Sequence, residues 1–170
     1  MSDTTLRILL VLSTTRWSRP LVDHAVEEAT QADAAGKTIE FDVLYIIEQE
    51  ELDRVHRSIG EAGFLGATPQ AEVTSVLMQE HLRVARKRIA EARKAVEDRG
   101  YSTSEREVTG AYEETVRQAA AEGRYDVIFL SRSDQPFLTR FFYGSEADRV
   151  ARWVRKEGFG KVVVEDTDEG

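Results

Sequence analysis

The 170-residue chain contains no cysteine, no excess of basic residues and no long apolar run. The absence of cysteine excludes disulfides, thiolate nucleophiles and cysteine-based zinc sites. The three histidines lie in separate segments without ligand spacing, so we expect no metal site. A net charge of -8 disfavours nucleic acid as a partner. Because the apolar run Ile8–Leu12 is too short for a membrane span or a signal-peptide core, we expect a cytoplasmic protein with no membrane partner.

Short apolar runs alternate with longer helical segments, a pattern typical of a parallel sheet covered by crossover helices. The five predicted strands are Leu6–Leu12, Glu40–Ile47, Glu105–Val108, Asp126–Ser131 and Lys161–Val164. The first, fourth and fifth are nearly continuous runs of Ile, Leu and Val, as expected where helices cover both faces of a sheet. We therefore expect residues 1–170 to form one α/β domain around an open parallel sheet.

Apolar residues at helical spacing predict helices between these strands. The predicted helices lie between Pro20 and Gly36, around Met78–Val96, at Glu113–Glu122 and from Ser145 onward. Ser145 with Asp148 three residues later forms a variant of the capping box, which marks a helix start. The segment from about 50 to 74 is longer than a usual strand-to-helix connection, and we interpret it as an insertion or lid.

A ligand site is expected at the carboxyl ends of the strands, where neighbouring crossovers leave the sheet in opposite directions. Two segments compete for that position, namely residues 13–15 after the first strand and residues 131–145 after the fourth. The second segment ends at a predicted helix N-terminus, where free backbone N–H groups and the helix dipole attract an anion. Gly144 permits a close approach there, and Ser145 caps the helix.

Within the second segment, Ser131 and Asp134 are separated by two residues, and nine more precede the pair Gly144 and Ser145. This spacing resembles the phosphate-binding motif of the universal stress protein family, in which glycines occupy the first three positions and serine or threonine the last. The likeness extends over essentially the whole chain. It implies an adenine nucleotide alpha hydrolase-like fold with strand order 3-2-1-4-5 and helices on both faces of the sheet.

The resemblance also implies a place for the adenosine part of a nucleotide. The family's aspartate at the end of strand one, which contacts adenosine, falls on Ser13. The family's adenine-contacting apolar residue falls on Ile46 in the second strand. Ser13 is thus a departure from the nucleotide-binding pattern, whereas Ile46 keeps its apolar character.

Two further departures affect the phosphates. Side chains at Ser131 and Asp134 obstruct the close passage of backbone to phosphate, and Asp134 adds a like charge. Arg132 and Arg140 would offset part of this repulsion. The resemblance therefore implies that binding of ATP or AMP is weakened or absent.

The sequence is consistent with two classes of function. The first is a cytoplasmic stress-response module, regulatory or protective, that binds an unidentified protein partner. The alternative is an ATP- or AMP-binding universal stress protein that acts as a nucleotide-responsive switch. We assign no catalytic residue, because no histidine neighbours a nucleophile in the sequence and no carboxylate pair stands apart, although a weak ATPase stays possible.

The family resemblance implies a homodimer that associates through the last strand. The residues expected at this interface are Val162, Val163 and Val164. They would form the exposed edge of the sheet, whose free N–H and C=O groups can pair with a second copy of the chain.

Overall fold

A computed structural model describes residues 4–61, 67–133 and 145–167 of the chain. Its centre is a five-stranded sheet in the order β3-β2-β1-β4-β5, and every neighbouring pair is parallel. The strands are β1 (Thr5–Ser13), β2 (Thr38–Glu48), β3 (Thr103–Gly110), β4 (Val127–Ser131) and β5 (Lys161–Glu165). The predicted order of the strands and their parallel pairing are confirmed.

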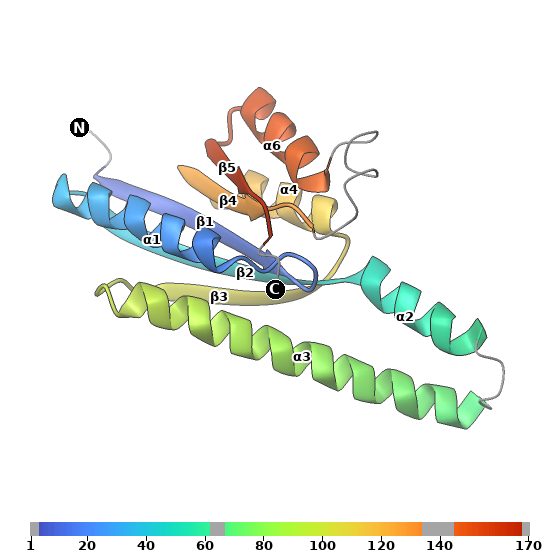
Figure 1. The fold of residues 1–170 in the computed structure, drawn as a ribbon. Coiled ribbons are helices and arrows are strands. Elements are labelled where there is room, and N and C mark those ends of the chain that lie inside the picture. Colours follow the sequence, from blue (N-terminus) through green and yellow to red (C-terminus); the bar gives the residue numbers. More distant parts are fainter. Residues whose placement is uncertain (1–3, 62–66, 134–144, 168–170) are drawn as a thin grey trace.

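Helices cover both faces of this sheet (Figure 1). They are α1 (Arg19–Ala34), α2 (Gln49–Glu61), α3 (Ala67–Glu97), α4 (Tyr112–Gly123) and α6 (Glu146–Glu157). Buried residues of α1 and α3 share one apolar cluster with one face of the sheet, and those of α4 and α6 share a second cluster with the opposite face. The predicted α/β architecture is therefore confirmed.

The residues of β1 show how the two clusters arise. Successive side chains of a strand point to opposite faces. Accordingly Ile8 and Leu10 pack toward α1 and α3, while Leu9 and Val11 pack toward α4 and α6. All four side chains are fully buried. Burial of each such aliphatic side chain stabilises the fold by about 1.5–3 kcal/mol, which explains why an unbroken apolar run forms the central strand.

The helix ends follow the residues that predicted them. Ser18 caps α1 by accepting a hydrogen bond of 3.2 Å from the backbone N–H of Leu21. Ser145 caps α6 in the same way, with 3.0 Å from the N–H of Asp148 to its hydroxyl. Gly158 follows α6 with φ +74°, a left-handed conformation that favours glycine. The capping residues therefore determine where the helices that connect the strands begin and end.

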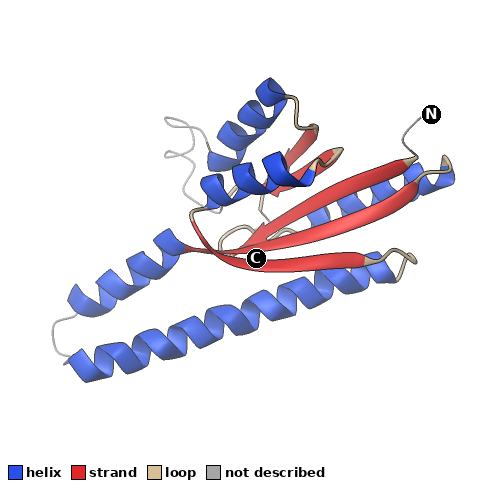
Figure 2. Cartoon of the chain, turned by 180° about the vertical axis from the view of Figure 1, so that it is seen from behind, coloured by secondary structure: helices blue, strands red, loops and turns tan. Residues whose placement is uncertain are grey.

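The segment from 50 to 74, expected as an insertion or lid, contains α2 and the first part of α3. Helix α2 follows β2 without a loop, and α3 begins well before Met78. Together α2 and α3 form a hairpin that extends past the carboxyl end of the sheet (Figures 1 and 2). Between the two helices, Leu52 of α2 lines a small cavity together with Leu77 and Met78 of α3, and His56 Nδ1 lies 3.3 Å from the Thr74 hydroxyl.

Within the described ranges, no helix is both long and apolar enough to cross a membrane. The same part of the chain holds no group of three or more His, Cys, Asp or Glu side chains arranged to bind a metal ion.

Candidate functional site

The first and fourth strands lie side by side in the middle of the sheet, with Ile8 opposite Val127 and Leu10 opposite Phe129. The chain leaves β1 toward α1 on one face and leaves β4 toward α6 on the other. The two carboxyl ends, at Ser13 and Ser131, therefore flank the point where the crossovers diverge, which is where open α/β sheets bind ligands.

Ser13 is tied to the end of the neighbouring strand. It pairs with Ile46 in the sheet, so Glu48, two residues further along β2, projects from the same face. The buried hydroxyl of Ser13 donates a hydrogen bond of 2.8 Å to Glu48 Oε2. Thr15 donates to the same oxygen through its backbone N–H at 3.1 Å and its hydroxyl at 2.5 Å. The position of the family's adenosine-contacting aspartate is thus occupied by a serine whose hydroxyl is already hydrogen-bonded to a glutamate.

Arg16 completes this cluster with a buried positive charge. Only 3% of its side chain is exposed, and it pairs with Glu48, whose side chain is 11% exposed. The other guanidinium nitrogen, Nη2, donates to Glu146 Oε2 at 3.2 Å, which joins the cluster to the first residue of α6. The Cζ atom of Arg16 also lies 3.6 Å from the centre of the Tyr112 ring. A desolvated guanidinium held this way between carboxylates and an aromatic face is strongly positioned.

We use the word notch for the space beyond the carboxyl ends of β1 and β4. Tyr112 closes its apolar side. It is 3% exposed and shares the buried cluster beneath α4 with Ile46, which is fully buried. Burial raises the pKa of the Tyr112 hydroxyl well above its ordinary value. The structure therefore covers Ile46, the expected adenine contact, with protein atoms.

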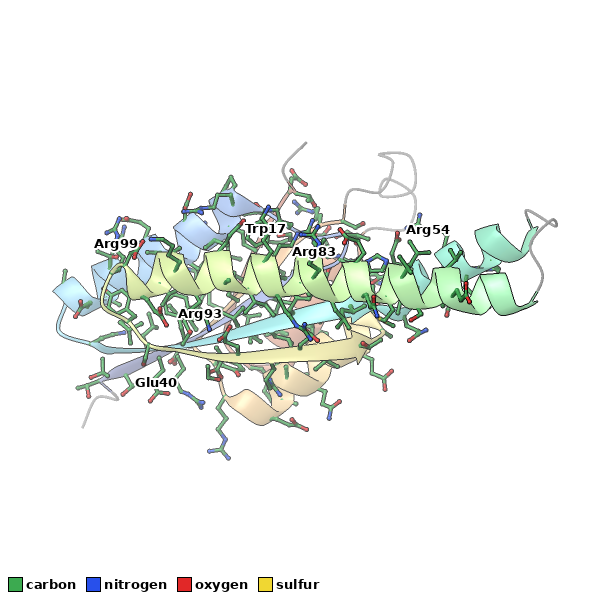
Figure 3. All side chains as sticks on the ribbon, turned by 90° about the horizontal axis from the view of Figure 1, so that it is seen from below. Trp17, Glu40, Arg54, Arg83, Arg93 and Arg99 are labelled. Carbon is green, nitrogen blue, oxygen red and sulfur yellow. The ribbon has the colours of Figure 1, made fainter. Side chains whose placement is uncertain are left out.

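Arg88 of α3 supports the same turn from the opposite face of the sheet. Its Nη1 donates to the backbone carbonyls of Ser13 at 3.1 Å and Thr14 at 3.0 Å, and to the Tyr45 hydroxyl at 3.1 Å. Its Cζ atom also lies 5.7 Å from the centre of the Trp17 ring. Figure 3, which looks onto α3, labels Trp17 beside the middle of this helix. The residues after β1 are consequently held from both faces.

The structure brings Arg132 and Ser145 together at the N-terminus of α6. Arg132 makes two bonds of 3.0 Å to the carboxylate of Asp148, and Ser145 donates to that carboxylate at 2.5 Å. Arg132 Nη1 also lies 3.3 Å from the carboxylate of Asp166, near the end of the chain. Burial alone would raise the pKa of Asp148, but the hydrogen bonds from Arg132 and Ser145 together lower it below its ordinary value.

The remaining predicted residues have different outcomes. The hydroxyl of Ser131 is buried and finds no hydrogen-bond partner in the described part of the chain. Asp134, Arg140 and Gly144 lie outside the described residues. Their relation to Arg132 and Ser145 stays a prediction.

The last strand, β5, lies at one end of the sheet order and pairs with β4. Val162 is buried, whereas Val163 and Val164 are partly exposed. The predicted interface residues therefore lie on an edge strand, as expected.

The sequence interpretation missed the residues that fill the notch, which are Arg16, Glu48, Tyr112 and Glu146. One signal was present. Glu48 continues the alternation of Leu44 and Ile46, so an acid follows apolar residues on one face of a buried strand. An acid placed there needs a buried partner.

Two cavities adjoin this cluster. One, of about 690 Å³, is lined by residues 14–16, Glu48, Glu146 and several charged residues of α2, including Arg54. Figure 3 labels Arg54 on α2, beside the part of α3 that extends past the sheet. The other, of about 730 Å³, is lined by residues of α4 and α6 and by Glu50 of α2. Glu50 and Glu146 line both cavities.

The sheet order and the diverging crossovers define an adenine nucleotide alpha hydrolase-like fold. The model of the universal stress protein family matches residues 4–156, and the chain belongs to this family. No curated protein matches the sequence.

Solved structures share the fold at low sequence identity. The universal stress protein UspA from Lactobacillus plantarum is 13% identical, with a TM-score of 0.60 over 94% of this chain and 96% of that one. A universal stress family protein from Burkholderia pseudomallei is 15% identical, with a TM-score of 0.56 over 96% and 97%. The hypothetical protein MJ0577 is 18% identical, with a TM-score of 0.62 over 98% and 99%.

Proposed function

We propose that this chain is a nucleotide-independent member of the universal stress protein family, a regulatory or protective module that acts by binding another protein. The observation that carries this proposal is the buried pair of Arg16 and Glu48 at the end of β1. Nucleotide binding through Ser13 and Ile46 would require this pair and the Tyr112 ring to move. Breaking a buried ion pair costs about 3–5 kcal/mol, which is comparable to the whole binding free energy of a millimolar ligand.

Charge in the phosphate half of the notch supports the same proposal. Of the two cations expected to meet a phosphate, Arg132 lies in the described part of the chain, and it already pairs with the carboxylates of Asp148 and Asp166. A phosphate would have to displace these internal anions, which are held by the same kind of charge-assisted hydrogen bond that it would make.

Calorimetric titration with ATP, ADP and AMP, with and without magnesium, tests the proposal. We expect no binding with a dissociation constant below about 1 mM. Tighter binding would overturn the proposal and favour the alternative, a nucleotide-responsive switch. The buried Ser131 hydroxyl, which has no hydrogen-bond partner among the described residues, favours that alternative together with the cap at Ser145.

Restoring the family motif provides the matched positive control. The changes are Ser131→Gly and Asp134→Gly combined with Ser13→Asp. Since the Ser13 hydroxyl lies 2.8 Å from Glu48, an aspartate at position 13 would face a second carboxylate, and the variant also needs Glu48→Gln. We expect the variant with all four changes to bind ATP more tightly than the native chain. Equal absence of binding in both would contradict the assigned cause.

We further propose that the chain acts as one domain in which α2 serves as a lid over the polar cavity beside Glu48. We also propose that it forms a homodimer through β5, because this edge strand offers backbone groups and partly exposed valines for pairing. Family membership supports the expected cytoplasmic location, which cell fractionation would test.

A further inference from the structure

The cavity of about 730 Å³ between α4 and α6 has the size of a small-molecule site. Its apolar wall includes Trp153 and Tyr112. The charged groups that line it are the carboxylates of Glu50, Glu113, Glu114 and Glu146 and the guanidinium groups of Arg117 and Arg149. This combination of an aromatic wall and an excess of acidic side chains favours a positively charged ligand.

Both arginines that line the cavity pair with Glu113. Arg117 donates to Glu113 at 2.6 Å, and Arg149 donates to the same carboxylate at 3.3 Å. Arg117 also lies with its Cζ atom 5.2 Å from the centre of the Trp153 ring. These contacts hold both guanidinium groups beside Glu113, and the four carboxylates that line the cavity outnumber its two guanidinium groups.

Around Glu146 and Glu50, negative charge exceeds positive charge. Glu146 has Arg16 as its partner, but Arg16 also pairs with Glu48. Glu50 is exposed, lines the same cavity and forms no ion pair with any residue in the described part of the chain. Burial raises the pKa of Glu146, and the charges of Glu50 and Glu48 raise it further against the opposing effects of Arg16 and Arg149. The ionised form of Glu146 is therefore short of positive charge.

A buried hydroxyl belongs to the same cavity. Tyr112 lines the cavity and is 3% exposed, yet its hydroxyl has no hydrogen-bond partner among the described residues. Arg16 stacks on the ring of Tyr112 and donates to Glu146 at 3.2 Å, so Tyr112 and Glu146 contact the same guanidinium group. A buried polar atom without a partner is unfavourable unless a ligand or water supplies one.

We propose that this cavity binds a small organic cation through an ammonium or guanidinium group held by Glu50, Glu146 and the Tyr112 hydroxyl. The N–H groups of such a ligand supply donors to both carboxylates and to the hydroxyl oxygen, and its carbon chain packs toward Trp153. Arg16 already shows this form of recognition within the chain, because its guanidinium stacks on Tyr112 and pairs with Glu146. The cavity shares Tyr112 and Glu146 with the charged cluster of Arg16 and Glu48, but its ligand is a cation, so titrations with agmatine and with nucleotides test the two proposals separately.

Calorimetric titration of the full chain with agmatine tests the proposal, because agmatine carries a guanidinium and an ammonium group on a four-carbon chain. The uncharged control ligand is 1,4-butanediol. The salt concentration is held at about 0.15 M to screen the net negative charge of the protein. We expect saturable binding of agmatine and none of the diol. Absence of saturable agmatine binding overturns the proposal.

Three variants locate the binding. Glu50→Gln removes an exposed carboxylate outside the buried pairs, and Tyr112→Phe removes a hydroxyl without a partner, so both variants are expected to fold. Each should weaken agmatine binding, with Glu50→Gln doing so by about tenfold or more. The control is Glu157→Gln, the same change in α6 but away from the cavity. Equal weakening in the control, or unchanged binding in Glu50→Gln, overturns the proposal. Unchanged binding in Tyr112→Phe overturns the role of the hydroxyl.

Discussion

Arg16 lies with its guanidinium carbon 3.6 Å from the centre of the Tyr112 ring, although the two residues follow different strands of the sheet. The contact joins the turn after β1 to the first residue of α4. It brings the charge of Arg16 into an environment from which water is excluded, since Tyr112 is 3% exposed. The contribution of Arg16 to the free energy of unfolding can be measured by substitution.

Arg16→Met should destabilise the protein by about 3–5 kcal/mol, because it leaves Glu48 and Glu146 without their shared cation. Urea unfolding followed by circular dichroism measures this change. The control is Arg19→Met, which removes an exposed pair with Asp23 and should cost less than about 1 kcal/mol. Adding Glu48→Gln to Arg16→Met should recover part of the loss. Equal effects of the two arginine substitutions would contradict the importance of the buried pair.

Glu146 should make the protein more stable as the pH falls from neutral toward 4.5, the ordinary pKa of its carboxyl group. Burial, followed by the charges of Glu50 and Glu48, raises the pKa of Glu146 in the folded state. Between the two pKa values the folded chain binds this proton and the unfolded chain does not, so the free energy of unfolding rises as pH decreases. Unfolding free energies of the native chain and Glu146→Gln, measured across this window, should differ in slope. Parallel curves would refute the assignment.

Asp148 should act with the opposite sign. Burial tends to raise its pKa, but bonds from Arg132 and Ser145 prevail and lower it below the ordinary 3.8. Its contribution to stability is present above pH 3.8 and is lost as the pH falls through the lowered folded value. Compared with Asp148→Asn, the native chain should lose stability more steeply in this acid range. Acid titration monitored by circular dichroism checks this, and identical acid profiles would contradict it.

Val164→Pro should convert the proposed dimer to a monomer of 19.2 kDa. Lys161 N–H donates to Asp126 and Arg132 N–H donates to the carbonyl of Glu165, so the odd-numbered residues of β5 direct their backbone groups to β4. The N–H of Val164 consequently points to the free edge, where proline removes a donor without breaking the β4–β5 ladder.

Light scattering gives the mass of this variant and of Val164→Thr, which keeps the N–H and a branched side chain. We expect Val164→Thr to retain the mass of the native protein. A native chain that is already monomeric, or a dimer that survives Val164→Pro, would disprove an interface at this edge.

Gly160→Ala should destabilise the fold more than Gly158→Ala. At Gly160, φ is +117° and an added Cβ would lie 2.4 Å from the carbonyl oxygen of Tyr125, a contact that backbone movement must relieve. At Gly158, φ is +74° but the space is open. We expect losses of about 2 kcal/mol or more and about 1 kcal/mol respectively, measured by thermal unfolding. A reversed order would contradict the tight approach of the turn before β5 to the turn before β4.

The strands and most of the helices could be predicted from the sequence, because the patterns that indicate them involve residues close together in the chain. Continuous apolar runs such as Ile8–Leu12 and Val127–Leu130 predicted strands covered on both faces, and Ser145 with Asp148 predicted a helix start. The strand order was different, since it came from the family resemblance and not from periodicity. The helical nature of residues 49–61 was also missed, because a long charged segment resembles a surface connection.

The candidate site was predicted only in its location. Ser13 and Arg132 were identified, but their partners were not: Glu48 lies 35 positions from Ser13, and Asp148 and Asp166 lie 16 and 34 positions from Arg132. Such contacts depend on the register of neighbouring strands and on the direction of long side chains, which no local pattern encodes. The sequence therefore predicted a pocket obstructed by Ser131 and Asp134, whereas the structure shows a charged cluster of Arg16, Glu48 and Glu146 beside Ser13.

The hairpin of α2 and α3 is anchored at two points close to that cluster. Glu48 immediately precedes α2, and Arg88 of α3 holds the carbonyls of Ser13 and Thr14. Both helices of the hairpin are therefore attached to the sheet close to the buried charges. A change in the position of the hairpin would therefore alter the contacts that hold the residues after β1.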